Sequence, residues 1–450
     1  MRSPGSRMQI MPNNQPGSKF AAWIFGCALA LGLICIAGFG GVYVYIWVPV
    51  WLGLYGLTSA AMLYQSGSGR RLCWHPLFGP ILAFGGLVFL QWRLRLSLYP
   101  GTTLTGLLQL SGCACMFYLM LFAVESEGTR ALRVWAWVLW LFTGLISTEA
   151  VFQFFSSHGF IYWFHDASYA TPIGPYVYHN HFAGCMDLLL PVSVAVAFRQ
   201  ERSEDPVWIT WLRRALVPAL GFAAVVISRS RGGIITLFVE VALALMIFGG
   251  ELRGKPAMAR TFWISFASLA GFSVLANWHP VIGRFGKFAS HDPSLLDRLR
   301  VWHACWNIFL AHPLWGTGFN TFASVYPAYQ NFDNGLIFLF AHNDYVQALA
   351  ETGTLGMLCV VAFLTLWFLA GRRQWRRQDR NSGIRILQAA AWIGASGFLF
   401  HSFGDFQFHA PANALLFFMV AAMAVAPATI TNYIKIRHMT QQYRKIAAVD

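Results

Sequence analysis

The sequence predicts an all-α protein that crosses a membrane many times. Hydrophobic residues make up 57% of the 450 residues and charged residues only 11%, whereas a soluble globular domain carries roughly 25% charged residues. The mean hydropathy is +0.51. Runs of about 20 mostly apolar residues, the length that a helix needs to cross a bilayer, recur along the chain, so we expect a polytopic membrane protein with about 12 transmembrane helices.

The predicted spans follow one another with mostly short connections. They lie at residues 20–38, 41–63, 76–91, 104–124, 134–155, 180–198, 214–228, 232–250, 261–277, 354–370, 385–403 and 411–428. One connection is long, and a loop of such length in a compact protein usually has a function. The predicted organisation is a disordered tail at 1–19, nine helices at 20–277, the long loop at 278–353, three helices at 354–428 and a basic tail at 429–450.

The basic residues are distributed unevenly over this topology. With the N-terminus inside, 24 of the 32 Lys and Arg residues fall on inside segments, as the positive-inside rule requires, and both termini are then cytoplasmic. The pI near 9.7 follows from this rule and from anionic headgroups, so we expect membrane lipids and no nucleic acid as partners. The basic residues that fall outside are Arg93, Arg95, Arg229, Arg231, Arg284, Lys287, Arg298 and Arg300. We expect this outer group to bind an anion.

The cysteines indicate neither a metal site nor redox chemistry. Of the eight cysteines, only Cys305 lies in the long outer loop, and the chain has no CxxC pair and no Cys/His spacing typical of zinc. We therefore expect no metal and no cofactor.

The long outer loop contains signals for two helices. Asp292-Pro293 is typical of an N-cap followed by proline at the first helical position, and His312-Pro313 ends this first helix. Its apolar residues recur at alternating steps of four and three, as on one face of a helix: Leu295, Leu299, Trp302, Trp306 and Phe309. A second helix is expected from about Asn343 to Glu351, ended by Gly353.

His342 is the leading candidate for a catalytic residue. It lies at the beginning of the second helix, where the positive end of the helix dipole disfavours the imidazolium and keeps the ring able to accept a proton. The alternative is a histidine that only forms hydrogen bonds at the membrane interface.

Two arginines are candidates for binding phosphate. Arg231 lies in Ser230-Arg231-Gly232-Gly233 at the outer start of a span, where helix N–H groups and a guanidinium can both face an anion. Arg298 lies near the first turn of the first loop helix, where anions are also favoured. Arg229 is two residues from Arg231. The alternative for Arg229 and Arg231 is a role as interfacial anchors.

Three acidic residues fall within predicted spans: Glu149, Asp187 and Glu240. Ionisable groups in hydrocarbon are costly and are usually paired or functional. For Asp187 we expect pairing with an arginine, and a role in carrying ions is the alternative.

Three stretches together resemble the O-antigen ligase and polymerase superfamily of integral membrane glycan transferases. The first is Asn180-His181-Phe182-Ala183-Gly184, leading to Pro191, and the second is Ser230-Arg231-Gly232-Gly233. The third runs from Arg298-Leu-Arg300-Val-Trp302 through His312-Pro313-Leu-Trp-Gly-Thr-Gly318 to His342-Asn343 and Glu351. Their order and spacing match the family over roughly residues 130–420.

The resemblance implies a GT-C-like membrane fold in the bacterial inner membrane, with an active site on a large periplasmic loop. The donor would be an undecaprenyl diphosphate-linked glycan, and the acceptor a glycan or lipid A–core hydroxyl. The reaction would be metal-independent and inverting. By this resemblance His342 is the general base, and Arg231 and Arg298 hold the diphosphate. Supporting roles would fall to Arg229, Arg300, Asn180, His181 and Asn343.

One position departs from the family. Many relatives have arginine where this chain has His179. If that arginine contributes to donor binding, either Arg93, Arg95 or Arg229 takes its part here or the donor differs.

Other functions share parts of this pattern. A polymerase that joins lipid-linked repeat units, or a protein O-oligosaccharyltransferase, would use the same donor half of the site. A transporter or flippase of lipid-linked sugars should carry charged residues along a path through the membrane. The arginines and histidines here gather at the outer surface instead, which favours an enzyme.

Overall fold

The computed structural model describes residues 19–167, 170–197, 206–253, 293–333, 335, 337–379 and 382–427. The predicted span at 261–277, most of both predicted tails, and the candidates Asp292, Arg284 and Lys287 lie outside these residues. Within the described part the chain is almost entirely helical, and its sheet consists of two short antiparallel strands. The predicted all-α class is therefore confirmed.

The helices follow in the predicted order. The first group is α1 (Lys19–Ala37), η1 (Phe39–Gly41), α2 (Val44–Gly67), α3 (Phe78–Arg93), α4 (Pro100–Glu127), α5 (Thr129–Ser156), β1 (Phe160–Ile161) and β2 (His165–Asp166). The second is α6 (His179–Ala197), α7 (Val207–Trp211), η2 (Leu212–Leu216), α8 (Val217–Ser228) and α9 (Arg231–Arg253). The third is α12 (Pro293–Ala311), α13 (Phe322–Val325), η3 (Tyr326–Ala328), α14 (Asp344–Arg377), α15 (Gly383–His401), η4 (Gln407–His409) and α16 (Pro411–Val425).

Nine helices of the described part are long and apolar enough to cross a membrane. The predicted span at 411–428 forms the shorter apolar helix α16, and the span at 76–91 forms α3, which has 16 residues. The chain is thus a multi-pass membrane protein, and ten of the twelve predicted spans correspond to helices that are apolar along their length.

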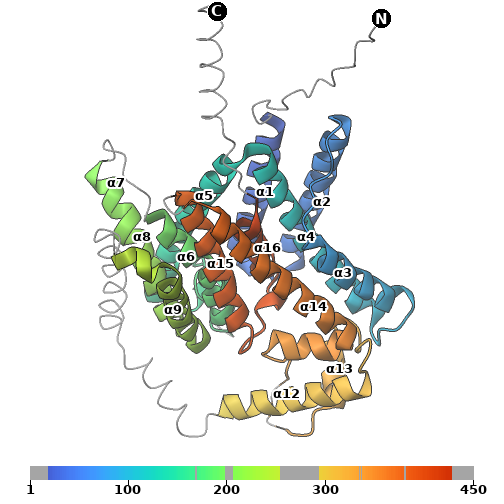
Figure 1. Cartoon of the computed structure of the whole chain (residues 1–450). Helices are drawn as coiled ribbons and strands as arrows, with labels where there is room; N and C mark the ends of the chain where they lie inside the picture. Colours follow the sequence, from blue (N-terminus) through green and yellow to red (C-terminus); the bar gives the residue numbers. More distant parts are fainter. Residues whose placement is uncertain are drawn as a thin grey trace, which may run out of the picture.

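Helix α16 forms the centre of the bundle. All of its 15 residues are buried, as expected for a helix that is apolar on every side. It packs against α4, α14 and α15, and α15 packs in turn against α6 and α9. Figure 1 shows α15 and α16 in the middle of the molecule, with α6 to α9 on one side and α3 and α4 on the other.

The two helices predicted in the long loop are both present. α12 ends at Ala311, just before His312-Pro313, and in Figure 1 it lies across the lower end of the bundle beside α14. Buried side chains of α12, among them Val301 and Cys305, form a small core of their own with Phe322 and Ala350. This separate core fixes α12 against the beginning of α14.

Gly353 interrupts α14 where the second loop helix was expected to end. Its backbone is left-handed, with φ +61°, and a Cβ there would clash with the backbone of Leu314. Gly316 also has a positive φ, +69°, and a Cβ there would clash with the backbone of Glu351. The two segments therefore approach through a pair of glycines, and the loop helix and the following span form one interrupted element.

Candidate functional site

The candidate site lies around the connection between α15 and α16, residues Ser402–Ala410, which we call the 402–410 loop. Asp405 in this loop is buried. His342 contacts it from the segment that precedes α14, with 3.2 Å between Nδ1 of the ring and Oδ1 of the carboxylate. A histidine and an acid that are 63 residues apart in the chain thus form a pair.

Local backbone features hold His342 in place. Its φ is +52°, an uncommon conformation for a residue with a side chain. Asn343 follows as the N-cap of α14 and accepts hydrogen bonds from the backbone N–H groups of Tyr345 and Val346. Trp302 of α12 donates to the carbonyl of Ala341 at 2.9 Å. The predicted place of His342, at the beginning of the helix, agrees with this geometry.

Further donors hold Asp405. The side-chain amide of Asn180, at the start of α6, donates to its second carboxylate oxygen, and the backbone N–H of Phe406 donates to Oδ1 at 2.9 Å. The same Asn180 amide donates to the hydroxyl of Tyr178 at 2.8 Å. Because three donors converge on a buried carboxylate, Asp405 is fixed in orientation.

Electrostatics keep Asp405 ionised. Burial on its own would raise the pKa of this carboxyl group, but the hydrogen bond from His342 and the positive charge of Arg298 outweigh burial and hold the pKa well below its usual range. Arg298 reaches the same loop, since its guanidinium donates to the carbonyl of Gly404 at 2.6 Å.

The His342–Asp405 pair can act as a base. A carboxylate only accepts hydrogen bonds, so the ring hydrogen faces it from Nδ1. Nε2 then carries the lone pair, and it makes no hydrogen bond with any described residue. The His342 side chain is 23% exposed. A proton from an incoming group can therefore reach Nε2, which is the arrangement that general-base catalysis needs.

The predicted arginines are placed differently from one another. Arg298 contacts the 402–410 loop, whereas Arg300 lies 3.4 Å from Asp297 and over the ring of Phe332. The structure therefore brings Arg298, and not Arg300, to the loop of Asp405.

Arg229 and Arg231 lie between α8 and α9. Arg229 is exposed and lies over the ring of Phe154. Arg231 is half-buried and begins α9, and a Cβ on its neighbour Gly232 would clash with the ring of His401, at the end of α15. The glycine therefore gives a close approach between two helices, and it brings Arg231 to the side of the bundle from which the 402–410 loop starts.

Two more family positions have structural roles. His181 is buried, with its ring 4.6 Å from that of Phe406, and Phe406 in turn lies 4.8 Å from the ring of His342. His179 lies with Nδ1 2.8 Å from the carbonyl of Ser228 and so joins α6 to the end of α8.

Asp405 is the main residue that sequence reasoning missed. The available signal was an acid between two closely spaced predicted spans, in Gly404-Asp405-Phe406-Gln407. The acids that were singled out lie deeper. Asp187 is paired as predicted, but its partner is His401 and not an arginine, with 2.7 Å between Oδ2 and Nδ1.

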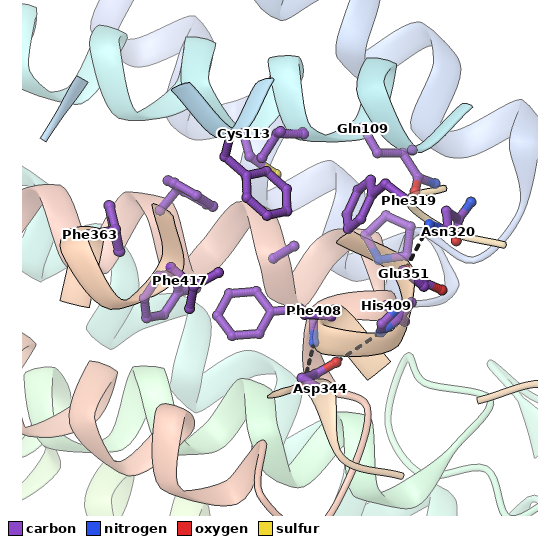
Figure 2. Close-up of a pocket in the computed structure, with 18 of the residues that line it drawn as sticks. Gln109, Cys113, Phe319, Asn320, Asp344, Glu351, Phe363, Phe408, His409 and Phe417 are labelled. Atoms are coloured by element: carbon purple, nitrogen blue, oxygen red, sulfur yellow. Dashed lines mark hydrogen bonds and ion pairs between the residues drawn. The ribbon is translucent and has the colours of Figure 1, made fainter. Parts of the chain in front are cut away.

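A cavity of about 430 Å³ adjoins the site. Figure 2 shows the rings of Phe363 and Phe417 toward one end and most of the labelled polar groups toward the other, with Phe408 between them. The labelled polar groups are Gln109, Asn320, Asp344, Glu351 and His409. Among the described residues, the lining includes no Lys or Arg, so an uncharged apolar chain suits it better than a diphosphate does.

The cavity runs along helix α14. Its lining on this helix runs from Asp344 to Leu364, a distance of roughly 30 Å at the rise of an α-helix. His181 also lines it, so a side chain that touches Phe406 belongs to both the cavity wall and the candidate site. No group of three or more His, Cys, Asp or Glu side chains within the described ranges is placed to hold a metal ion.

The fold and the site define a multi-pass α-helical membrane protein with a histidine–carboxylate pair where α6, α14 and α15 meet at one end of the bundle. Residues 216–361 match the O-antigen ligase family model. The matched region includes Arg231, Arg298 and His342, and it supports the resemblance of the chain to the O-antigen ligase superfamily. A comparison with curated proteins found no significant match. The match supports a membrane glycan-processing function of the O-antigen ligase or polymerase type.

Proposed function

We propose that this protein is a glycosyltransferase that moves a glycan from undecaprenyl diphosphate to an acceptor hydroxyl at the periplasmic face of the inner membrane. The acceptor in this proposal is lipid A–core, as for a ligase. The observation that carries the proposal is the His342–Asp405 pair, whose 3.2 Å contact leaves Nε2 of the ring open to a substrate.

The reaction is a single displacement. The acceptor hydroxyl gives its proton to Nε2 of His342 while its oxygen forms a bond to the anomeric carbon of the donor. The bond between this carbon and the diphosphate oxygen breaks, and its electron pair leaves with the diphosphate. Attack from the side opposite to the leaving group inverts the anomeric configuration, so we expect an inverting enzyme.

Each neighbouring group has one part in this displacement. Asp405 holds the ring so that Nε2 faces the acceptor and stabilises the imidazolium that forms. Arg231 and Arg298 bind the diphosphate and offset the charge that develops on it, which is the task of a metal ion in many soluble glycosyltransferases. Arg298 already lies at the loop of Asp405, so one loop serves both the base and the leaving group.

The cavity along α14 suits the lipid part of a lipid-linked substrate. Its aromatic lining and its lack of Lys and Arg fit an apolar chain, and its polar end lies beside Asp344, two residues from His342. A chain that occupies it would keep its head at the site while the rest stays in the bilayer.

The glycan profile of a strain that lacks the gene tests this function. Long glycans that accumulate on undecaprenyl diphosphate beside bare lipid A–core are expected for the ligase. Single repeat units, on the carrier or on the acceptor, would show a polymerase instead. An unchanged set of surface and carrier-linked glycans would exclude both.

A further inference from the structure

Two histidines, the buried His401 and the half-buried His409, lie at the two ends of the 402–410 loop. His401 directly precedes the loop, and its Nδ1 is 2.7 Å from Oδ2 of Asp187 in α6. His409 lies near the end of the loop, and its Nδ1 is 2.8 Å from Oδ1 of Asp344 in α14. The histidine side chains are 1% and 13% exposed. Each end of the loop is therefore joined to a different helix through a histidine–aspartate pair.

The orientation of Gln407 fixes the hydrogen on His401. The amide nitrogen of Gln407 donates to the carbonyl of Asn180 at 3.0 Å. Its amide oxygen accepts from Asn413 at 3.0 Å, and Asn413 itself is oriented because it donates to the carbonyl of His181. The Gln407 nitrogen therefore faces Nε2 of His401, at 3.3 Å, so this ring nitrogen must be the acceptor and Nδ1 carries the hydrogen.

Gln347 does the same for His409. Its amide nitrogen donates to Glu351 at 3.0 Å, and its amide oxygen accepts from the backbone N–H of Ala341 at 2.9 Å. The nitrogen also lies 2.8 Å from Nε2 of His409, which must again be the acceptor. Both histidines thus have the same form, a neutral ring that donates from Nδ1 to an aspartate and accepts at Nε2 from a glutamine.

Each arrangement reaches the catalytic pair through one intervening residue. Asn180, which accepts from Gln407, donates to Asp405. Ala341, which donates to Gln347, immediately precedes His342. Asp344 contacts both ends of the loop, because its backbone N–H donates to the carbonyl of Ser402 and its carboxylate accepts from the N–H of Phe408.

We propose that His401 and His409 are positioning residues that clasp the 402–410 loop in neutral form and so hold Asp405 against His342. The inference rests on the proposed glycan transfer, in which this pair is the base. A purely space-filling role is the opposing explanation. The two explanations differ in one respect: a clasp needs a donor and an acceptor at each position, whereas space filling needs only volume.

Glutamine and leucine substitutions separate these explanations. A glutamine at 401 or 409 has an N–H donor and a carbonyl acceptor without a charge, whereas leucine has only similar bulk. We expect His401→Gln and His409→Gln to keep at least about half of the wild-type kcat. We expect His401→Leu and His409→Leu to lose roughly 10- to 100-fold in kcat, the effect of small misplacements of catalytic groups, with the KM for the lipid-linked donor within about threefold.

The assay uses the full-length protein in liposomes, with purified lipid-linked glycan and lipid A–core. Gln388→Leu is the matched control: Gln388 is buried in the same helix α15, where it donates to the carbonyls of Met423 and Ala426, far from the loop. We expect it to lower thermal stability and to leave kcat within about twofold. Glutamine variants that are as inactive as the leucine variants would overturn the proposal, and so would leucine variants with wild-type kcat.

Hydrogen–deuterium exchange of the 402–410 segment gives a readout that does not depend on transfer. We expect faster exchange in this segment for both leucine variants and wild-type exchange for both glutamine variants. If the exchange follows this pattern while the wild-type protein transfers no glycan, the positioning role of His401 and His409 is supported and the proposed function is wrong. If glycan transfer depends on His342 but the exchange is the same in all variants, the positioning role of His401 and His409 is wrong. Should His401→Leu not fold, Gln407→Leu removes the same contact from the loop side. Gln347→Leu does so for His409 from α14, and both have the same expected result and the same contradicting one.

Discussion

Two connections at the same end of the bundle contrast sharply. The 402–410 loop joins α15 to α16 and buries Asp405, Gln407 and Ser402. The hairpin between α5 and α6, with β1 and β2, exposes two neighbouring aromatic rings, Phe164 at 73% and Trp163 at 49%, whereas the 402–410 loop exposes the single ring of Phe403, at 55%.

The backbones of the two connections differ as well. Tyr162 and Trp163 both have a positive φ, 54° and 62°, which costs about 1–2 kcal/mol for each such residue. An exposed aromatic turn of this kind is typical of the belt that meets lipid headgroups. The comparison teaches that position at this end of the bundle does not by itself identify a site. Buried polar groups that are held by several hydrogen bonds do.

Of the substitutions that test this comparison, His342→Gln should lower the rate of glycan transfer the most. Glutamine cannot accept the proton of an acceptor hydroxyl, so we expect glycan transfer to fall by about 10²–10⁴-fold, with little change in the unfolding temperature. Initial rates in liposomes measure this effect, and thermal unfolding of the same preparation is the control. A variant with near wild-type rate would show that another group is the base.

Asp405→Asn should have the second largest effect on the rate of glycan transfer. The amide keeps the volume but removes the charge that holds the His342 ring, and we expect transfer to fall by about 10²–10³-fold. A loss within about twofold would leave the aspartate as a packing residue only.

Asp405 should also make stability depend on pH. Because its pKa in the folded protein is lowered, it contributes stability above the unfolded pKa, which is near 3.9, and this contribution is lost as the pH falls through the lower folded pKa. The unfolding temperature of the wild-type protein should therefore decrease in acid more steeply than that of Asp405→Asn, when both are measured between pH 7 and pH 3. Parallel curves would contradict the lowered pKa.

Arg298→Lys should have an intermediate effect. Lysine keeps the charge but loses the forked donor geometry that suits a diphosphate, so we expect the KM for the lipid-linked donor to increase by about tenfold. Arg300→Lys is the matched control, because Arg300 lies on Asp297 and Phe332, and we expect its KM to stay within about twofold. Equal effects of the two changes would remove the distinction between these arginines.

Phe164→Ser should have the smallest effect. This ring is exposed in the hairpin, and we expect transfer within about twofold and stability within about 0.5 kcal/mol of wild type. A loss as large as that of Arg298→Lys would give the hairpin a part in the reaction, through stacking on sugar rings for example, and would break the contrast between the two connections.

Much of the fold follows from local signals. Apolar runs mark the spans, Pro293 marks the start of α12 and Gly353 marks the break in α14, because caps and chain breaks depend on a few neighbouring residues. The same local signals place His342 at the beginning of a helix. They also place Arg231 at the start of α9.

The partners in the site could not be predicted in this way. Asp405 is 63 residues from His342 and Asp187 is 214 residues from His401, and both pairs exist only because α15 packs against α6 and α14. Gly232 shows the same limit. Its place beside Arg231 is visible in the sequence, but its close contact with His401 depends on how two distant helices cross.

The two glycines that face each other between α12 and α14 also constrain how this chain can evolve. A side chain at Gly316 would meet the backbone of Glu351, and one at Gly353 would meet the backbone of Leu314. A compensating change in a neighbouring side chain cannot relieve either clash, because the obstacle is main chain. Substitution of either glycine is therefore excluded, and related proteins that retain this geometry should keep both glycines.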